Sequence, residues 1–247
     1  MNYTLITGAT GGIGQALAQE FARHGHSLIL LGRNINHLES LTQQLSILYP
    51  NLSFHYYAVD LADTEKLITT LSTICAHHPV DIVINNAGIG RFEAVQDLSE
   101  EAIDAQLDIN LKAPMLITRF FLNQLIERRG ALIYICSILS DLPNQKASVY
   151  AASKHGLLGF ANTVRLEHPE LYVLTVHPST VRTHFFGKMV TGKFVLEPET
   201  VAQKTYRAFK RRKRRLNIPK SIGLLRLCYL FFPRLIDRIN RRFFTNK

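Results

Sequence analysis

Two side chains one helical turn apart, Tyr150 and Lys154, have the types and spacing needed to move a proton. Residues at i and i+4 share one face of a helix, and the pattern predicts a helix over residues 149–167. A free tyrosine has a pKa of about 10, so we expect the lysine cation to favour the phenolate and lower that pKa. Tyr150 can then donate a proton to a carbonyl oxygen. Ser137, thirteen positions before Tyr150, can hydrogen-bond the same oxygen and stabilise its developing charge.

A glycine-rich stretch, TGATGGIG at residues 7–14, follows a predicted strand over residues 3–7 and opens a predicted helix over 13–24. Glycines let the backbone approach an anion closely, and the free N–H groups at a helix N-terminus point at it. The pattern indicates a phosphate site, and its alternative is a tight turn without a ligand. The predicted cofactor contacts in this stretch are Gly8, Thr10, Gly12, Ile13 and Gly14.

Strand and helix patterns alternate along the rest of the chain. This alternation predicts an α/β fold, a Rossmann-type doubly wound parallel sheet with helices on both faces. Ligands of such sheets bind at the carboxyl ends of the strands, near the switch point. The other predicted strands are 27–31, 54–59, 81–84, 132–136 and 172–176, and the other predicted helices are 35–48, 64–77, 99–129 with a break near Pro114, and 149–167.

The polar motifs fall at these strand ends. Residues 85–88 read NNAG after the fourth predicted strand, Ser137 follows the fifth, and Asn110 lies on the middle helix. Each residue alone fits an ordinary structural role, but their joint order is improbable by chance. With TGATGGIG at 7–14 and YAASK at 150–154, the chain resembles the short-chain dehydrogenase/reductase family, in its short single-domain branch, over roughly residues 3–183.

The resemblance implies roles for particular residues. Lys154 would also hold the nicotinamide ribose, and Asn110 would anchor a water in the proton relay. Further cofactor contacts would come from Thr183 at the nicotinamide amide and from the aspartate that meets the adenine. These implied cofactor residues are Asp60, Asn86, Ala87, Gly88, Tyr150, Lys154 and Thr183.

The sequence departs from the family pattern in three places. Ser179 stands where a glycine is frequent, and His155 follows the lysine where a small residue is common. A glycine-rich seventh strand used in tetramer contacts is missing, with residues 216–219 as a short substitute. We therefore expect a homo-oligomer, with a dimer favoured over a tetramer.

The preference for NAD or NADP depends on the residues at the end of the second predicted strand. Gly32 occupies the position where an acid would bind the adenosine ribose hydroxyls of NAD, and Arg33 follows it. The planar fork of an arginine pairs well with a 2′-phosphate, although Arg33 also fits a solvated surface side chain. The sequence favours NADP(H), with NAD(H) as the second candidate.

Apolar side chains are predicted around the substrate. Phe185 and Phe186 lie in a loop over residues 181–198 that should cover the site, Leu139 follows the serine, and Phe92 follows the NNAG motif. They indicate an apolar ketone or 3-oxoacyl substrate. Packing of a lid onto the body explains them equally well.

Charge divides the chain. Residues 207–247 hold 14 Lys/Arg and one acid, whereas residues 1–206 hold 15 Lys/Arg and 18 Asp/Glu, within a net charge of +10. We therefore divide the chain into an NAD(P)-binding Rossmann catalytic domain, residues 1–206, and a basic helical extension of the same domain, residues 207–247.

The end of this extension is amphipathic. Leu235, Ile236, Ile239 and Phe243 share one side of a helical wheel, opposite several arginines. A basic amphipathic helix can lie on an anionic membrane. The alternatives are a solvated charge run and a helix packed on the body or in a dimer, and nucleic-acid binding is disfavoured.

Three scattered cysteines without metal-ligand spacing fit free thiols in a reducing cytoplasm and predict no metal site. No signal peptide is recognised. The prediction is a cytoplasmic NADP(H)-dependent carbonyl reductase or alcohol dehydrogenase, in contact with the inner face of a membrane if the extension binds lipid. The rival is a nucleotide-binding regulatory or membrane-associated scaffold protein without turnover.

Overall fold

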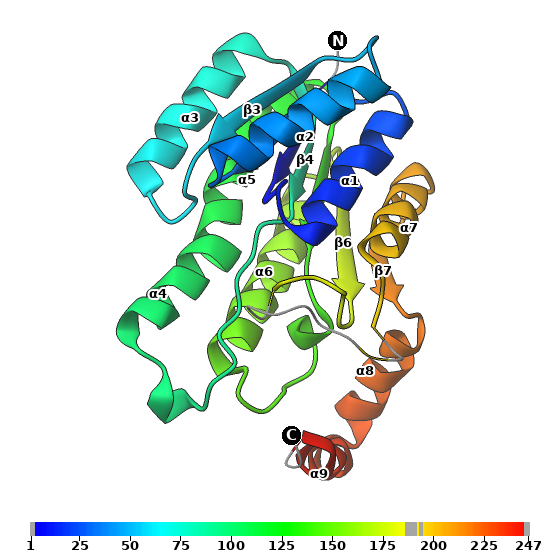
Figure 1. Ribbon diagram of the computed structural model, residues 1–247. Helices are drawn as coiled ribbons and strands as arrows, with labels where there is room; N and C mark the ends of the chain where they lie inside the picture. The colour runs from blue at the N-terminus through cyan, green and yellow to red at the C-terminus, as the bar shows by residue number, and fades with distance from the viewer. Residues whose placement is uncertain (1–2, 186–191, 193–194, 245–247) are drawn as a thin grey trace.

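A single parallel sheet organises the chain. The computed structural model describes residues 3–185, 192 and 195–244, and side chains within this part as far as residue 238. In it, seven strands pair in parallel in the order β3-β2-β1-β4-β5-β6-β7 (Figure 1). This order confirms the predicted Rossmann-type sheet, and its switch point lies between β1 and β4. The strands are β1 (Tyr3–Thr7), β2 (Ser27–Gly32), β3 (Phe54–Ala58), β4 (Val80–Asn85), β5 (Ala131–Ile135), β6 (Tyr172–Pro178) and β7 (Arg215–Ile218).

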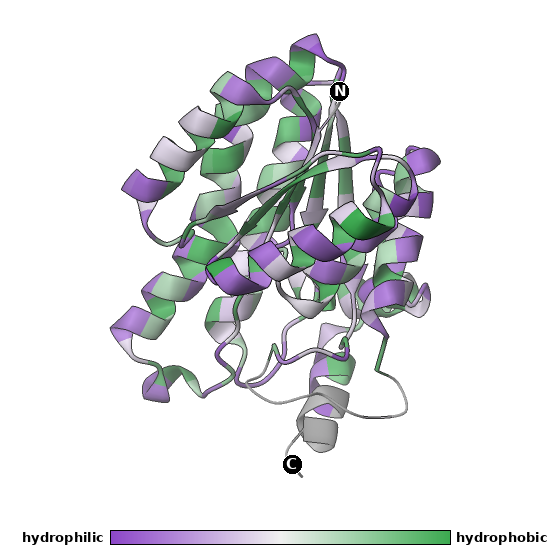
Figure 2. Cartoon of the chain, turned by 45° about the horizontal axis from the view of Figure 1, so that its top comes forward, coloured by the Kyte–Doolittle hydropathy of each residue, from purple (hydrophilic) through white to green (hydrophobic). Residues whose placement is uncertain are grey.

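Helices cover both faces of the sheet. Side chains alternate along each strand, so one strand feeds two apolar cores: Leu5 of β1 packs on one face and its neighbour Ile6 on the other. Figure 2 shows apolar residues concentrated on the strands and polar residues on the outer sides of the helices. Helices α1 (Gly12–Arg23), α2 (Ile35–Leu48) and α7 (Pro198–Lys210) cover one face, and α3 (Thr64–His77), α5 (Ala113–Glu127) and α6 (Ser148–Glu167) cover the other.

Several helices begin at a side chain that caps their free N–H groups. Asn34 accepts a hydrogen bond from the His37 backbone N–H at the start of α2, and Asp63 does the same for α3. Ser99 caps α4 (Glu100–Leu107). These local signals explain why the predicted helices 35–48 and 64–77 have the observed bounds.

The middle helix differs from its predicted form. The chain stays helical from Glu100 to Glu127, but residues Asp108–Lys112 form a π-helical turn between α4 and α5. Pro114 has no N–H to donate to the preceding turn, and the π-helical turn lies immediately before it, where it accommodates the missing hydrogen bond. The irregularity predicted near Pro114 therefore lies just before it, around Asn110. π-Helical turns are frequent at functional sites.

The carboxyl-terminal third corrects the predicted division of the chain. The boundary between residues 206 and 207 falls inside α7, whose Tyr206 ring packs edge-on against Phe21 of α1 at 5.1 Å. Residues 215–218 then form β7, which pairs with β6 and so belongs to the sheet. The chain beyond β7 continues past the sheet as α8 (Ser221–Phe231) and α9 (Pro233–Phe244). No helix of the described residues has the length and apolarity needed to cross a membrane.

Candidate active site

The glycine turn between β1 and α1 is built by close backbone approach. Gly8 has φ +63°, and a Cβ at this position would lie 2.9 Å from the Cα of Ala87. Only glycine meets both demands at low cost. A Cβ on Gly14 would overlap the carbonyl oxygen of Gly8. The turn therefore holds the end of β1 against the NNAG motif, which follows β4.

The same turn leaves the start of α1 open to an anion. Its N-cap is Gly11, which has no side chain to satisfy the first N–H groups. A Cβ on Gly12 would come within 2.7 Å of Cγ2 of Thr183, which lies beyond β6 in the sequence. The predicted contacts Thr10, Gly12, Ile13 and Thr183 thus belong to one region. This cradle of glycines at a helix N-terminus fits the pyrophosphate of a dinucleotide.

The NNAG motif is held by a residue that sequence reasoning missed, Thr7. The Thr7 hydroxyl oxygen accepts hydrogen bonds from the backbone N–H groups of Asn86 and Ala87, both at 3.0 Å. The Asn86 side chain donates to the carbonyl oxygens of Thr7 at 2.9 Å and Gly8 at 3.2 Å. Thr7 is the last residue of a buried strand. The one sequence signal for its role was its position as the first residue of the TGATGGIG stretch.

Asn110 connects three segments of the site. Its amide oxygen accepts from the Ile89 N–H at 2.8 Å, and its amide nitrogen donates to the Ile89 carbonyl at 2.8 Å and to the Ser153 hydroxyl at 3.1 Å. The Ser153 hydroxyl donates in turn to the Tyr150 carbonyl oxygen at 2.8 Å. Asn110 is fully buried, so it fixes the chain after the NNAG motif against α6. A Cβ on Gly88 would lie 3.2 Å from the Asn110 amide oxygen and 3.4 Å from Lys154 Nζ.

Ser137, Tyr150 and Lys154 meet at the carboxyl end of β5. The Ser137 hydroxyl accepts from the Leu139 N–H at 3.1 Å and lies close to the Tyr150 side chain. Lys154 Nζ donates to the Ile135 carbonyl oxygen at 3.0 Å and lies 5.9 Å from the centroid of the Tyr150 ring. All three side chains are less than 9% exposed. The sequence spacing therefore does bring these groups together.

The electrostatics of this cluster contradict one expectation. Burial raises the pKa of Tyr150 to about 12, so desolvation of the phenol, and not the charge of Lys154, sets the direction of the shift. The physical reason is that the phenol is enclosed, while the ammonium group is directed to a backbone carbonyl. Burial also lowers the pKa of Lys154 to about 8. The phenol is consequently protonated at neutral pH, the state that a proton donor needs.

Two predicted substrate residues enclose the Tyr150 ring. The centroid of the Phe92 ring lies 5.3 Å from that of Tyr150, and the Phe185 centroid lies 5.7 Å from it. A Cβ on Gly90 would come within 2.5 Å of Phe92 and 2.8 Å of Phe185. Leu139 is partly exposed in the short helix Ile138–Ser140. Phe186 lies outside the described residues.

The predicted adenosine end of the site lies at the carboxyl end of β2. Gly32 ends β2, and a Cβ there would lie 3.3 Å from the Thr10 hydroxyl, while Arg33 is exposed. The Asp60 carboxylate accepts from the Ala62 N–H at 3.0 Å after β3. Because β2 and β3 are paired to Gly32 and Ala58, Arg33 and Asp60 follow neighbouring strand ends.

A buried polar network behind Ser137 was also missed by sequence reasoning. Asp141 pairs with the Arg215 guanidinium and lies 3.4 Å from His177 Nδ1. Burial opposes ionisation of Asp141, but hydrogen bonds from His177 and Arg215, together with the Arg215 charge, outweigh it and hold the pKa of Asp141 at about 2. The three residues come from three distant parts of the sequence, so no local pattern marks them. In the described part of the chain, no group of three or more His, Cys, Asp or Glu is arranged to hold a metal ion.

Known proteins resemble this chain in sequence. A family model described as short chain dehydrogenase matches residues 2–193. The bovine (Bos taurus) dehydrogenase/reductase SDR family member 7B is 34% identical over 211 residues, which are 81% of this chain and 65% of that protein. The chain thus matches slightly less than two thirds of that relative's length. The sepiapterin reductase of Chlorobaculum tepidum is 32% identical over 221 residues, covering 83% of this chain and 88% of that protein.

Solved structures resemble it in fold. An alcohol dehydrogenase from the archaeon Thermococcus sibiricus superposes with a TM-score of 0.80 at 26% identity, over 88% of this chain and 94% of the other. A short-chain dehydrogenase from Sphingobium yanoikuyae gives a TM-score of 0.85 at 24% identity, over 100% of this chain and 96% of the other. The sheet order, the match to the family model and these relatives lead to one conclusion: the chain belongs to the short-chain dehydrogenase/reductase family and is an oxidoreductase.

Proposed function

We propose that this enzyme reduces apolar ketones or 3-oxoacyl-type compounds with NADPH, and oxidises the corresponding alcohols in reverse. The observation that carries the proposal is that Ser137, Tyr150 and Lys154 are buried together at the carboxyl end of β5, with the rings of Phe92 and Phe185 beside the Tyr150 phenol. The proposed catalytic residues are Asn110, Ser137, Tyr150 and Lys154.

The chemistry divides between cofactor and protein. The nicotinamide, when bound, supplies hydride to the carbonyl carbon of the substrate. The Tyr150 hydroxyl donates its proton to the carbonyl oxygen, and the Ser137 hydroxyl donates a hydrogen bond to the same oxygen. The Lys154 ammonium stabilises the phenolate that remains and holds the nicotinamide ribose. Asn110 keeps Ile89 and Ser153 in position and anchors the water that returns the proton.

Cofactor binding rests on the glycine cradle and Arg33. The proposed contacts follow the carboxyl ends of β1, β2, β3, β4 and β6, with Thr183 next to Gly12. Arg33 is exposed beside Gly32, where its guanidinium can pair with a 2′-phosphate. The Thermococcus sibiricus enzyme was solved with 5-hydroxy-NADP, which supports NADP(H) over NAD(H). The proposed cofactor residues are Gly8, Thr10, Gly12, Ile13, Gly14, Arg33, Asp60, Asn86, Ala87, Gly88, Tyr150, Lys154 and Thr183.

Substrate preference rests on the apolar wall. Phe92, Leu139 and Phe185 surround the phenol, and Phe186 is proposed to join them from the loop that follows. Rings at this position favour apolar groups beside the carbonyl, because their burial removes apolar surface from water. A homodimer in the cytoplasm remains our proposal for the assembly and its location.

The test is a substrate panel. The purified full-length protein is mixed with NADPH and either apolar ketones, 3-oxoacyl compounds or open-chain sugars, and the loss of NADPH absorbance is followed. We expect turnover of the first two classes and little of the third. Fastest turnover of the polar sugars would overturn the substrate proposal, and NADPH consumption that no carbonyl compound accelerates would overturn the reductase proposal.

A further inference from the structure

The fold separates the basic residues of the carboxyl-terminal region into two groups. The run over residues 210–215 lies at the amino end of β6, where the Arg212 guanidinium covers the Tyr172 ring at 5.0 Å and the Arg214 carbonyl accepts from the Thr175 N–H. Helices α8 and α9 follow the opposite, carboxyl end of β7 (Figure 1). The basic residues that lie close together in the sequence of this region therefore do not form one surface in the fold.

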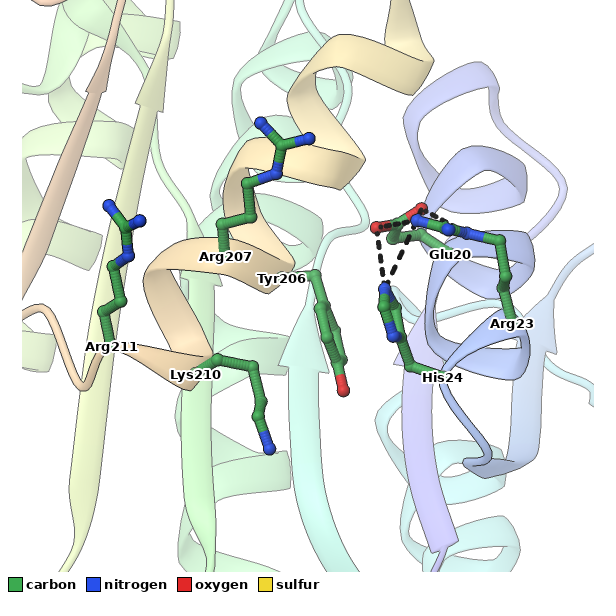
Figure 3. Close-up of a pocket in the computed structure, with 7 residues that line it drawn as sticks. All are labelled: Glu20, Arg23, His24, Tyr206, Arg207, Lys210 and Arg211. Atoms are coloured by element: carbon green, nitrogen blue, oxygen red, sulfur yellow. Dashed lines mark hydrogen bonds and ion pairs between the residues drawn. The ribbon is translucent and has the colours of Figure 1, made fainter.

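The first group does not form an anion site. A cavity of about 350 Å³ lies between the ends of α1 and α7 and is lined by Arg23, Arg207, Lys210 and Arg211. Figure 3 shows Lys210 pointing away from Arg207 and Arg211, so these cations do not converge. Arg23 is already paired with Glu20 at 2.9 Å. Basic side chains at a helix C-terminus are adequately explained by the helix dipole.

The second group accompanies a large exposed apolar surface. Large apolar side chains on α8 and at the start of α9 are solvent-exposed, some by more than two thirds, such as Leu230 at 71% and Phe231 at 70%. Several large exposed apolar side chains on two consecutive helices mark a candidate binding surface, because soluble monomers rarely expose much clustered apolar surface without a binding role. We call this set the tail apolar face: Leu224, Leu225, Leu227, Leu230, Phe231, Phe232 and Leu235.

Basic residues are interspersed with the tail apolar face along the sequence. Between residues 220 and 244 the sequence has six Lys/Arg and one acid, Asp237. Among them, Arg234 and Arg238 are exposed on α9. Exposed apolar side chains with basic neighbours on short helices match the composition of helices that lie in a lipid interface.

We infer that α8 and α9 dock on an anionic lipid surface, with the tail apolar face in contact with the lipid. Charge complementarity selects this partner. A second copy of the chain would bring two sets of cations together over the same apolar face, whereas anionic headgroups neutralise them. The helices lie on the membrane, since neither is long and apolar enough to cross it.

Contacts with the body orient the docked enzyme. Ile222 of α8 is buried, and Arg226, one turn later on the same side, pairs with Asp141 at 3.1 Å. Asp141 lies four residues after Ser137, so α8 is attached beside the chain that follows the proposed catalytic serine. The carboxyl edge of the sheet would then face the lipid, which is where an apolar substrate accumulates.

The experiment is co-sedimentation of the full-length protein, with NADPH present, with vesicles of phosphatidylcholine alone or mixed with phosphatidylserine. We expect binding to the mixed vesicles only, and its loss when salt is raised from about 0.1 M to about 1 M, which shortens the Debye length from roughly 10 to 3 Å. Phe231→Asp should abolish binding. Arg234→Glu with Arg238→Glu should weaken the partition coefficient by roughly 25-fold or more, because each basic residue near the surface contributes about fivefold.

Matched controls separate this face from the rest of the surface. Leu166, at the far end of α6, is an equally exposed leucine, so Leu166→Asp should leave binding unchanged. Lys210→Glu with Arg211→Glu changes as much charge at the amino end of β6 and should also have little effect. Equal loss in the control variants, or no sedimentation of the wild type, overturns the inference. So does a dimer, seen by light scattering, that Phe231→Asp dissociates while lipid does not bind. Sedimentation is read without turnover, so this result is independent of the proposed activity.

Discussion

The Nδ1 atom of His177 lies 3.1 Å from the backbone carbonyl oxygen of Ser137. His177 is fully buried, and burial lowers the pKa of its imidazole, which favours the neutral ring; in the tautomer that carries its proton on Nδ1, the ring donates to that carbonyl. In the part of the chain that the structure describes, Nε2 has no hydrogen-bond partner. The end of β6 thereby supports the backbone that carries the proposed catalytic hydroxyl.

This contact makes His177 a positioning residue. His177→Leu removes the donor and should lower kcat by about tenfold, the effect of losing one buried hydrogen bond of roughly 1.5 kcal/mol, with the NADPH Kd unchanged. His177→Asn keeps an N–H donor near the same place and should retain most of the activity. A merely structural role predicts that both variants lose stability and activity together, which thermal unfolding and steady-state kinetics distinguish.

Tyr150→Phe removes the proposed proton donor and leaves the ring in place between Phe92 and Phe185. We expect kcat to fall by about 10²–10⁴-fold, the usual contribution of a general acid, while NADPH still binds. Stopped-flow reduction and fluorescence titration with NADPH measure the two quantities. Tyr206→Phe, a buried tyrosine between α1 and α7, is the matched control. Turnover of Tyr150→Phe at the wild-type rate contradicts the assignment.

The pH dependence of reduction should report Lys154. Its pKa is lowered to about 8 by burial, so the ammonium is present below pH 8 and lost above it, whereas the Tyr150 phenol, with a pKa of about 12, stays protonated. We expect kcat/KM to be flat up to pH 8 and then to fall by about tenfold per pH unit. Lys154→Arg keeps a cation at all these pH values, so its profile should lose that fall. A wild-type profile that is flat beyond pH 9 argues against a role for the lysine charge.

Arg33→Ala tests cofactor selection. Losing a charge-assisted hydrogen bond to the 2′-phosphate should weaken NADPH binding by about 1.5–3 kcal/mol, and NADH binding should change little, because NADH lacks that phosphate. Calorimetric titration of both cofactors measures the difference. Arg119→Ala removes another exposed arginine, on α5, and should affect neither. Equal weakening of NADPH and NADH, or a wild type that prefers NADH, contradicts the NADP(H) proposal.

The sequence by itself determined six strands of the sheet and the members of the proposed catalytic cluster. Strands buried on both faces read as short apolar runs, and caps such as Asn34 and Asp63 mark helix starts, so local patterns predicted these elements closely. Tyr150 and Lys154 share a helix face through simple periodicity. Gly8 and Gly14 signalled a turn that only glycine can form with such close backbone contacts.

Only the tertiary structure decided the environment of these groups. Burial of the phenol, with the rings of Phe92 and Phe185 beside it, raises the Tyr150 pKa where a lowering was expected. Burial is a property of the packed chain, and no local pattern encodes how much water a phenol keeps.

Long-range packing also decided the carboxyl-terminal third. Helix α7 has exposed basic residues as well as an apolar face, so its sequence did not indicate how it packs. The tertiary structure shows that it packs through Tyr206 onto α1. Strand β7 forms because the edge of β6 provides backbone hydrogen-bond partners for it. Asp141, His177 and Arg215 are distant in sequence and meet only because β6 and β7 are neighbours. The same pairing sends α8 and α9 to the carboxyl edge and leaves residues 210–214 at the other end, since a strand carries the chain from one edge of a sheet to the opposite one.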